Sequence, residues 1–470
     1  MLDLLLVQFA LGAFDTLYHH EIREQLPYRR GASTELRIHG VRALVYAAIA
    51  VGLGWLEWRG WLAVVPVALF AVEIGLTLAD FVVEDRTRKL PASERVTHTL
   101  LAVNGGAFLL ALGATLAGWW QAASTLVLAD HGWRGWLLSL GAAGLVASGL
   151  RDLHAARKLA AMGGGPRADF GGRRLSVLVS GATGFIGRRL VWALLDAGHA
   201  VTLHVRDEAR AWLLFDGRVG VHKSLPEKAS FDVVINFAGA PVVGLPWTRS
   251  RRRALLESRL GTTGELVEFI ARSNPRPALL VNASAIGYYG DRGDEPMTER
   301  DAGRAEFMSE LCKAWERCAE RAGQFGVRVC TLRLGLVMGW GGALPMLMAP
   351  HLAALGARIG NGRQWVSWVH VDDVVQAVAF LVRTPQARGP FNVVAPGALR
   401  QDAFVRVIAE SYRRPLWLAI PAWLLERSLG EMARLFTRGQ WVQPTRLCEA
   451  GFRFRFARFD DALRDIRGRI

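Results

Sequence analysis

Five long apolar runs occupy most of the first 150 residues and limit what this part of the chain can form. They extend over residues 2–18, 36–56, 61–83, 96–120 and 133–150. Each run is near the ~20 residues that an α-helix needs to cross about 30 Å of hydrocarbon. Residues 1–160 are therefore predicted to form an all-α bundle of five transmembrane helices.

Basic residues gather at alternate ends of these runs and predict the orientation of the bundle. The opposite ends offer little beyond Arg59 and Arg134. The basic ends carry Arg23, Arg29, Arg30, Arg37, Arg86, Arg88, Lys89, Arg95, Arg151, Arg157 and Lys158. Because Lys and Arg favour the cytoplasmic side, we expect a multi-pass protein of the inner (cytoplasmic) membrane, with its N-terminus outside and residues 161–470 in the cytoplasm.

Acidic residues and histidines gather at the same cytoplasmic helix ends, mostly in i, i+4 pairs that share a helix face. The pairs are Asp15 and His19, Glu35 and His39, Asp80 and Glu84, Glu94 and His98, and Asp152 and His154. One interpretation is ion pairing with the nearby arginines. The other is a transition-metal site, since carboxylates and imidazoles suit iron, manganese or zinc. The candidate ligands are Glu35, His39, Glu84 and His98.

The excess of positive over negative charge lies almost wholly after residue 170. The formal net charge is +15, but the Lys and Arg residues are scattered. They form no recognised reading helix or aromatic platform, so nucleic acid is not an expected partner. A membrane lipid surface or a phosphorylated cofactor fits better. The four cysteines show no CxxC spacing, which suits reduced thiols facing a cytosol.

A glycine-rich linker, expected over residues 161–173, precedes a strand, a turn and a helix. The apolar stretch 175–180 predicts the strand, and GATGFIG at 181–187 predicts the turn and the helix start. In this GxxGxxG spacing the glycines permit a tight turn, close approach of a pyrophosphate and close helix packing. The helix N-terminus adds N–H donors and positive dipole. The predicted dinucleotide site contains Gly181, Thr183, Gly184, Phe185, Ile186, Gly187 and Arg188.

The following strands indicate which dinucleotide is bound. Arg206 ends the strand predicted at 199–206, where a carboxylate would hold the ribose of NAD. An arginine there, helped by Arg188, favours the 2′-phosphate of NADP, although Asp207 is adjacent. The strand at 231–239 is expected to bring three more cofactor-binding residues to the sheet edge. These are Asn236, Ala238 and Gly239.

The alternation of strands and helices continues with strands predicted at 278–284 and 327–334. This pattern is typical of an α/β fold with a doubly wound parallel sheet, which we expect over residues 174–400.

Together with the glycine turn, several later segments resemble the extended short-chain dehydrogenase/reductase family. Within that family they resemble an atypical branch, the epimerase-family or NAD-dependent epimerase/dehydratase-like proteins. The resemblance covers about residues 175–456. It implies bound NADP(H), a Rossmann sheet with helices on both faces, and a small C-terminal domain at 401–470 that completes the substrate cleft. The later segments are Asn236–Gly239, Ser258–Thr262, Ala283–Asp291, Leu332–Gly335, Trp368–Asp373 and Gly389–Val393.

The resemblance also implies a YxxxK pair, in which lysine lowers the pKa of a catalytic tyrosine. None of the six tyrosines of this chain has a lysine four residues later. The corresponding helix offers Phe307 or Met308 in place of the tyrosine, and Leu311 or Cys312 in place of the lysine. The usual proton relay is therefore absent.

Three other residues are the candidates for catalysis. Ser284 matches the family's serine at the end of a strand, and Tyr288 or Tyr289 is close enough in sequence to reach the nicotinamide. One interpretation is that one of these phenols is a substitute acid. The other is that the tyrosines pack over the nicotinamide and hold the substrate without donating a proton, because a phenol with a pKa near ~10 needs a nearby cation.

The preferred hypothesis is a membrane-anchored NADP(H)-binding oxidoreductase or epimerase-like protein that acts on a membrane-associated or lipid-linked substrate. The alternative is a non-catalytic NADP(H) sensor that reports redox state to the membrane domain. A narrower option is electron transfer from NADPH to a metal at the polar helix ends. The sequence does not indicate the oligomeric state.

Overall fold

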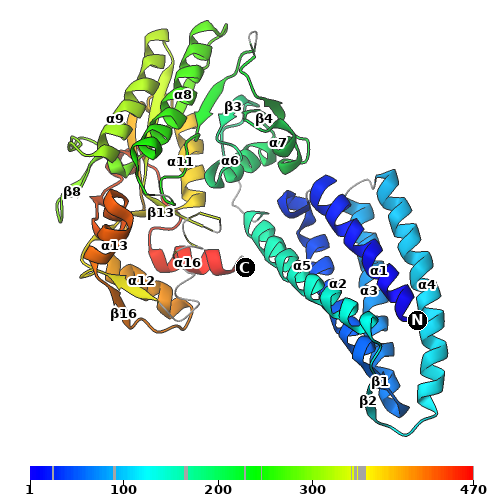
Figure 1. Cartoon of the computed structure of the whole chain (residues 1–470). Coiled ribbons are helices and arrows are strands. Elements are labelled where there is room, and N and C mark those ends of the chain that lie inside the picture. Colours follow the sequence, from blue (N-terminus) through cyan, green and yellow to red (C-terminus); the bar gives the residue numbers. More distant parts are fainter. Residues whose placement is uncertain are drawn as a thin grey trace. The chain divides into compact units, whose positions relative to one another are not determined.

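The computed structural model divides the chain into two compact units, Met1–Gly163 and Gly164–Ile470 (Figure 1). It describes all residues except 24–25, 88–90, 164–167, 227–228, 245, 340, 343, 345–346, 348–355 and 469–470, and all of their side chains except 22–23, 28, 86–87 and 161–163. Part of the predicted linker and the side chains of Arg23, Arg86, Arg88 and Lys89 lie outside the described residues. The expected boundaries at residues 160, 173 and 400 stay predictions.

The first unit is mostly helical. Its long helices are α1 (Leu2–Phe14), α2 (Ser33–Trp55), α3 (Val64–Thr87), α4 (Ala92–Trp120) and α5 (Trp133–Gly163). Its short helical segments are η1 (Asp15–Arg23), η2 (Leu26–Tyr28), η3 (Arg30–Ala32) and η4 (Gly60–Ala63). Strands β1 (Leu56–Trp58) and β2 (Leu126–Leu128) pair antiparallel at one end of the bundle. Buried side chains such as Leu5, Leu53 and Leu138 hold the helices together.

Three helical stretches are long and apolar enough to cross a membrane: Arg30–Trp55, Gly60–Asp85 and Ala92–Trp120. The first and fifth predicted spans also form helices. Within the described residues, however, α1 and α5 do not reach the combination of length and hydropathy that the other three have. Helix α1 has only 13 residues before η1 begins. The prediction of an apolar helical region is confirmed, and the spanning character is supported for three helices.

The second unit contains a seven-stranded sheet with the order β14-β9-β7-β6-β3-β4-β5, in which all neighbouring strands are parallel. Its strands are β3 (Ser176–Ser180), β4 (Ala200–His204), β5 (Gly220–His222), β6 (Val233–Asn236), β7 (Leu279–Ala285), β9 (Arg328–Leu334) and β14 (Gly389–Val393). The chain starts at β3 in the middle and builds outward in both directions. This order is that of a doubly wound Rossmann sheet, as the sequence predicts.

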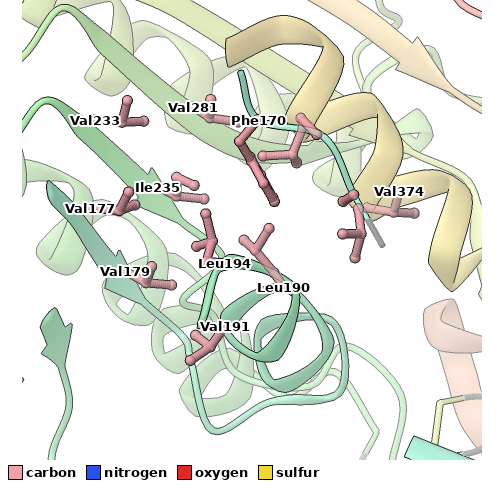
Figure 2. Close-up of a cluster of buried hydrophobic side chains, with 14 of the residues drawn as sticks. Phe170, Val177, Val179, Leu190, Val191, Leu194, Val233, Ile235, Val281 and Val374 are labelled. Atoms are coloured by element: carbon pink, nitrogen blue, oxygen red, sulfur yellow. The ribbon is translucent and has the colours of Figure 1, made fainter. Parts of the chain in front are cut away.

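Helices cover both faces of this sheet (Figure 1). Helices α6 (Phe185–Asp196) and α11 (Val371–Arg383) pack on one face against Val177 and Val179, as Figure 2 shows for the side chains around Leu190. Helices α8 (Arg249–Arg272) and α9 (Phe307–Glu320) pack on the other face, where Leu178 points. Successive residues of a strand point to opposite faces, so both faces of the buried strands are apolar.

The remaining elements of the second unit are short. They are α7 (Glu208–Leu214), η5 (Ile286–Tyr288), β8 (Pro296–Met297), η6 (Arg321–Phe325), β10 (Leu336–Met338), β11 (Ala357–Ile359), β12 (Trp365–Val366), β13 (Trp368–His370), β15 (Leu399–Arg400), α12 (Gln401–Ser411), β16 (Leu418–Ile420), α13 (Ala422–Leu429), η7 (Gly430–Ala433), α14 (Arg434–Thr437), β17 (Trp441–Val442), α15 (Thr445–Glu449) and α16 (Phe459–Gly468). Strand pairs β11-β16 and β8-β17 join residues after 401 to earlier loops, whereas β10-β13 and β12-β15 join segments that all precede residue 401.

Candidate functional site

The glycine turn after β3 is closely packed against the neighbouring strand and against helix α6. Gly181 has φ +71°, and a Cβ there would lie 2.4 Å from the carbonyl of Phe237. A Cβ on Gly187 would lie 2.2 Å from the carbonyl oxygen of Gly181. No side chain fits at either position, because real Cβ atoms do not approach other atoms so closely. These two glycines therefore set the path of the turn.

The middle of the turn is open. Gly184 is the N-cap of α6 and is exposed, as is Thr183. Among the described residues other than its chain neighbours, a Cβ on Gly184 would meet one atom within 4 Å, the Gly181 oxygen at 3.2 Å. The first four N–H groups of a helix have no partner within the helix. The N-terminus of α6 therefore offers backbone donors and a positive dipole to an anion.

Phe185 and Ile186, also predicted at this site, are half-buried. The ring of Phe185 packs against two glycines after β10: Cβ atoms on Gly339 and Gly342 would lie 2.7 and 2.5 Å from it. The ring is thus fixed against the protein. Phe185 contributes to the site through its backbone at the start of α6.

A buried polar ladder crosses the carboxyl ends of three central strands. Ser180, Asn236 and Asn282 are register partners on β3, β6 and β7. Ser180 Oγ donates to Asn236 Oδ1 at 2.5 Å, and Asn236 Nδ2 donates to Asn282 Oδ1 at 2.7 Å and to Thr263 Oγ1 at 2.9 Å. The backbone N–H of Ala238 donates to Asn236 Oδ1 at 3.1 Å.

The amide of Asn236 therefore has protein partners for both its donors and its acceptor. It holds the backbone of Ala238 in place beside the glycine turn. The next residue, Gly239, lies against Arg259, whose guanidinium carbon would be 3.1 Å from a Cβ there. These residues lie at the carboxyl ends of β3 and β6, where the connections leave the sheet toward opposite faces.

Arg206 and Asp207 follow β4 and have different surroundings. Arg206 is exposed, whereas the carboxylate of Asp207 accepts a hydrogen bond from the Arg210 N–H at 3.0 Å and caps α7. Arg188, on α6, is half-buried. Both side chains are exposed, and the cap uses only one oxygen of Asp207, so Arg206 lies beside a carboxylate at the end of β4.

The candidate catalytic residues lie in a buried chain of hydrogen bonds at the carboxyl ends of β7 and β9. Ser284 Oγ donates to Glu316 Oε1 at 2.6 Å. Arg333 donates to both oxygens of Glu316, at 2.9 and 2.8 Å, and to the Tyr289 hydroxyl at 3.0 Å. The Tyr289 hydroxyl donates to Asn392 Oδ1 at 2.7 Å.

Tyr289 is fully buried, and its hydroxyl both donates to and accepts from protein groups. Burial raises the pKa of Tyr289 to about 12, although the Arg333 guanidinium opposes this. The phenol therefore stays neutral and holds Arg333 and Asn392 together.

Tyr288 is only half-buried, and its ring lies against the same guanidinium, with Arg333 Cζ 3.4 Å from the ring centroid. Among the described residues, its hydroxyl has no hydrogen-bond partner. The two neighbouring tyrosines thus differ: Tyr289 is enclosed, and Tyr288 presents a free hydroxyl.

Sequence reasoning missed Glu316, Arg333 and Asn392, although Arg333 and Asn392 belong to the quoted segments Leu332–Gly335 and Gly389–Val393. The available signal was a charge or an amide inside an otherwise apolar strand, since such groups are buried only with partners. Cys312, which stands near the place of the family's lysine, is buried, and burial raises the pKa of its thiol to about 12. It is neutral and does not replace that cation.

Tyr288 is half-buried and packs against an apolar cluster. The buried cluster there includes Trp247, Leu311 and Met432, with Phe307 and Met308 packed against it. Met432 belongs to the C-terminal part of the unit, so this part and the loops after β6 and β7 meet at the same cluster.

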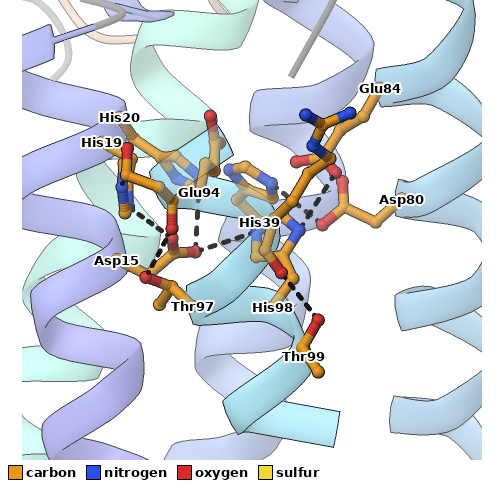
Figure 3. A network of polar contacts seen from close by, with 12 residues as sticks. Asp15, His19, His20, His39, Asp80, Glu84, Glu94, Thr97, His98 and Thr99 are labelled. Carbon is orange, nitrogen blue, oxygen red and sulfur yellow. Dashed lines mark hydrogen bonds and ion pairs between the residues drawn. The ribbon is translucent and has the colours of Figure 1, made fainter. Parts of the chain in front are cut away.

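The predicted metal ligands of the first unit are only partly brought together. His98 Nδ1 lies 3.7 Å from Glu84 Oε2, and His39 Nε2 lies 3.0 Å from Asp80 Oδ2 (Figure 3). Glu35 is buried, but among the described residues it is in neither of the two groups of this unit whose ligand atoms are close enough for one ion. Those groups are Asp15, His20, Glu94 and His98, and His20, His39 and Glu84.

Comparison with known proteins finds sequence and fold relatives of the second unit. Residues 177–394 match the NAD dependent epimerase/dehydratase family, and residues 420–466 match a domain of unknown function, DUF1731. The chain is 33% identical over 302 residues to epimerase family protein YfhF of Bacillus subtilis, covering 62% of this chain and 98% of that protein. It is 34% identical over 303 residues to the chloroplastic SDR39U1 homolog of Arabidopsis thaliana, covering 62% and 87%.

A solved structure of human epimerase family protein SDR39U1 with NADPH is also similar. It superimposes with a TM-score of 0.57 at 27% sequence identity, and the match covers 63% of this chain and all of that one.

Proposed function

Because this chain belongs to the NAD-dependent epimerase/dehydratase family, we propose that its second unit binds NADP(H) at the turn between β3 and α6 and acts as an oxidoreductase or epimerase-like enzyme. The observation that carries the proposal is the turn itself. Gly181 and Gly187 admit no side chain, while Gly184 leaves the helix N-terminus open. Such a cradle fits a pyrophosphate. When bound, the nicotinamide supplies or accepts a hydride.

NADP(H) is preferred over NAD(H) because of the charges after β4. Arg206 is exposed and able to pair with a 2′-phosphate, whereas Asp207 is engaged as the cap of α7. The preference therefore rests on the charge of Arg206, since the cap occupies only one of the two carboxylate oxygens of Asp207. The human relative solved with NADPH agrees with this preference.

Tyr288 is the residue that we propose to contact the substrate. Its hydroxyl has no protein partner in the described part of the chain, and Arg333 lies against the face of its ring. A guanidinium attracts the electron-rich face of a phenol and holds the ring in one orientation. Ser284 and Glu316 fix Arg333 rather than touch the substrate.

The surroundings of Tyr288 favour an apolar substrate. Trp247, Phe307 and Met308 contribute side chains that form no strong hydrogen bonds with a sugar or phosphate group. A lipid-linked or quinone-like molecule would bury apolar surface against them.

Delivery of such a substrate from a bilayer agrees with the first unit. Its candidate spans leave most of their surface uncovered by protein, including Val103 (69% exposed) and Leu110 (80% exposed). The second unit exposes apolar side chains as well, with Trp417 and Trp423 at 73% and 67%. Exposed apolar surface of this extent is typical of membrane or protein contact, and exposed arginines between residues 413 and 438 suit an anionic lipid surface.

NADPH consumption by native membranes that contain the full chain tests this function. We expect Tyr288→Phe to lower the rate by at least about tenfold, because the phenol is the proposed proton donor, while NADPH binding is retained. Tyr412→Phe, at a tyrosine outside the site, serves as the control and is expected to keep the wild-type rate. An unchanged rate in Tyr288→Phe would contradict the role of Tyr288.

A non-catalytic NADP(H) sensor is the second candidate. One observation favours it. The hydroxyl of Tyr289, which is hydrogen-bonded to Arg333, is enclosed by protein groups and is not accessible to a substrate. NADPH binding without consumption, with any lipid extract added, would support the sensor instead of the enzyme.

A further inference from the structure

The first unit holds a cluster of imidazoles and carboxylates that the NADP(H) site does not use (Figure 3). Its members come from three separate elements. They are Asp15, His19 and His20 on η1, Glu84 on α3, and Glu94 and His98 on α4. Asp15, His20, Glu84 and Glu94 are at most 7% exposed. We propose that Asp15, His20, Glu94 and His98 bind one divalent transition-metal ion of the zinc, iron or manganese class.

The distances between these atoms carry the proposal. His20 Nε2 lies 3.5 Å from Asp15 Oδ2 and 3.4 Å from Glu94 Oε1, and His98 Nε2 lies 3.3 Å from the same Asp15 oxygen. A charge-assisted N–H···O bond is shorter, about 2.7–2.9 Å. Ligands about 2.0–2.2 Å from a metal ion are separated from one another by about 3.3–3.6 Å in a tetrahedron. These three distances agree with ligand atoms around one ion, and the four ligand atoms all lie within 4.8 Å of one another.

His20 supplies an independent observation. It is 7% exposed, and within the described residues its Nε2 has no hydrogen-bond partner. A buried polar atom without a hydrogen bond is costly. The two carboxylates that face it at 3.4–3.5 Å would each bind the same cation as the imidazole.

The outer partners of the ligands also fit a metal site. His19 Nδ1 lies 2.9 Å from Asp15 Oδ1, so the other oxygen, Oδ2, is the one that faces His20 and His98. His98 turns its second nitrogen, Nδ1, toward Glu84 Oε2 at 3.7 Å. A hydrogen bond to a ligating carboxylate is a usual means of orienting it, whereas the 3.7 Å between His98 and Glu84 is too long for a hydrogen bond.

The local backbone explains how two adjacent histidines reach Asp15. Residues 15–23 form a π-helix, whose hydrogen bonds join residues i and i+5. In this wider helix, residues four and five positions after Asp15 both lie near it. An α-helix would place only His19 on the same face.

Charge and chemistry select the class of ion. Two carboxylates and two neutral imidazoles carry a net charge of −2, which one divalent cation neutralises. Mixed nitrogen and oxygen ligands suit zinc, iron and manganese, whereas calcium and magnesium prefer oxygen alone.

The surroundings of Asp80 are different, because Arg42 pairs with it at 2.7 Å and His39 contacts it at 3.0 Å. That neighbouring group is an ion-pair network, as the first of the two sequence interpretations expects.

Titration with Co²⁺ tests the site. The purified full chain in detergent is treated with a chelator, reloaded with Co²⁺ and followed by ligand-field absorption, and bound metal is counted by mass spectrometry. We expect about one Co²⁺ per chain with nitrogen and oxygen ligands. His20→Gln and Glu94→Gln are expected to weaken binding by at least about tenfold. His154→Gln, at an exposed histidine of α5, is the matched control and should bind as wild type.

The wild-type measurement decides the proposal even if the ligand variants do not fold. Stoichiometric Co²⁺ without a thiolate charge-transfer band supports it. No stoichiometric Co²⁺ in the folded wild type would overturn it and leave protonated histidines paired with carboxylates as the explanation of the cluster. A thiolate band, or wild-type affinity in a folded His20→Gln variant, would overturn it as well.

Discussion

Tyr288 and Tyr289 are adjacent in sequence but have different roles because of what surrounds each hydroxyl. Tyr289 lies between Arg333 and Asn392 in the interior, whereas the ring of Tyr288 lies against the same guanidinium and its hydroxyl has no hydrogen-bond partner among the described residues. The buried ion pair of Arg333 with Glu316 holds the guanidinium in its position between the two tyrosines. At the scale of single residues, one tyrosine stabilises the site and the other is available to a ligand.

Tyr289→Phe is predicted to destabilise the second unit by about 1–3 kcal/mol, because it leaves the buried Asn392 oxygen without its donor and removes one acceptor of Arg333. Chemical unfolding followed by tryptophan fluorescence measures this free energy. Tyr288→Phe is the matched control and should have wild-type stability, since its hydroxyl makes no protein hydrogen bond in the described part of the chain. Equal stability of both variants would contradict the assignment.

The same residue predicts a pH dependence. The pKa of Tyr289 is raised to about 12 in the folded protein, above its ordinary value of 10.0. The unfolded chain therefore loses this proton first, so the contribution of Tyr289 to stability is complete below about pH 10 and is lost as the pH rises toward 12. Wild type should lose up to about 1.4 kcal/mol per pH unit in this window relative to Tyr289→Phe.

Among the elements, the unit of β3, the glycine turn and α6 is the part that the sequence specifies best. Its strand, turn and helix are contiguous, and Gly181 and Gly187 each have a local steric reason to be glycine. The seven-stranded order also follows the alternating pattern of strands and helices. The buried network of Ser284, Glu316 and Arg333 could not be predicted in this way, because it joins β7, α9 and β9, which are far apart in the chain.

The polar ends of the first unit illustrate the same limit. The i, i+4 spacing selected His98, which is also in the proposed metal site, but it selected Glu35 and passed over His20. Spacing rules assume an α-helix, and residues 15–23 form a π-helix instead. Asp80 pairs with Arg42, whereas other buried acids of this unit face histidines. The sequence does not reveal this difference, because it depends on contacts between helices.

Gly187→Ala tests the close packing of α6 against the turn. The added Cβ would lie 2.2 Å from the Gly181 oxygen and 2.8 Å from the Ala182 Cα. We expect a loss of about 1–3 kcal/mol in the free energy of unfolding, as for other overpacked positions. Gly264→Ala on α8 is the control, because its Cβ meets no atom within 4 Å. There, alanine should stabilise the helix by about 0.5–1 kcal/mol. A stable Gly187→Ala variant would contradict this packing.

At the scale of the whole molecule, an apolar helical unit precedes a dinucleotide-binding unit in one chain. We predict that the full chain stays in the membrane pellet after an alkaline carbonate wash, since lipid-exposed helices are not released by breaking ionic contacts. Fractionation followed by immunoblotting measures this, with a peripheral membrane protein as the control that is released. Recovery of the folded chain in the wash would contradict membrane insertion.

Binding of NADPH at the turn between β3 and α6 is measured directly by titrating the purified full chain with NADPH and following its fluorescence. We predict saturable binding of one NADPH per chain, tighter than that of NADH. Gly184→Asp places a carboxylate where the pyrophosphate would lie and should weaken binding by at least about tenfold, whereas Gly323→Asp, at an exposed glycine remote from the turn, should bind as wild type. No saturable binding by folded wild type, or equal binding by Gly184→Asp, would contradict the account.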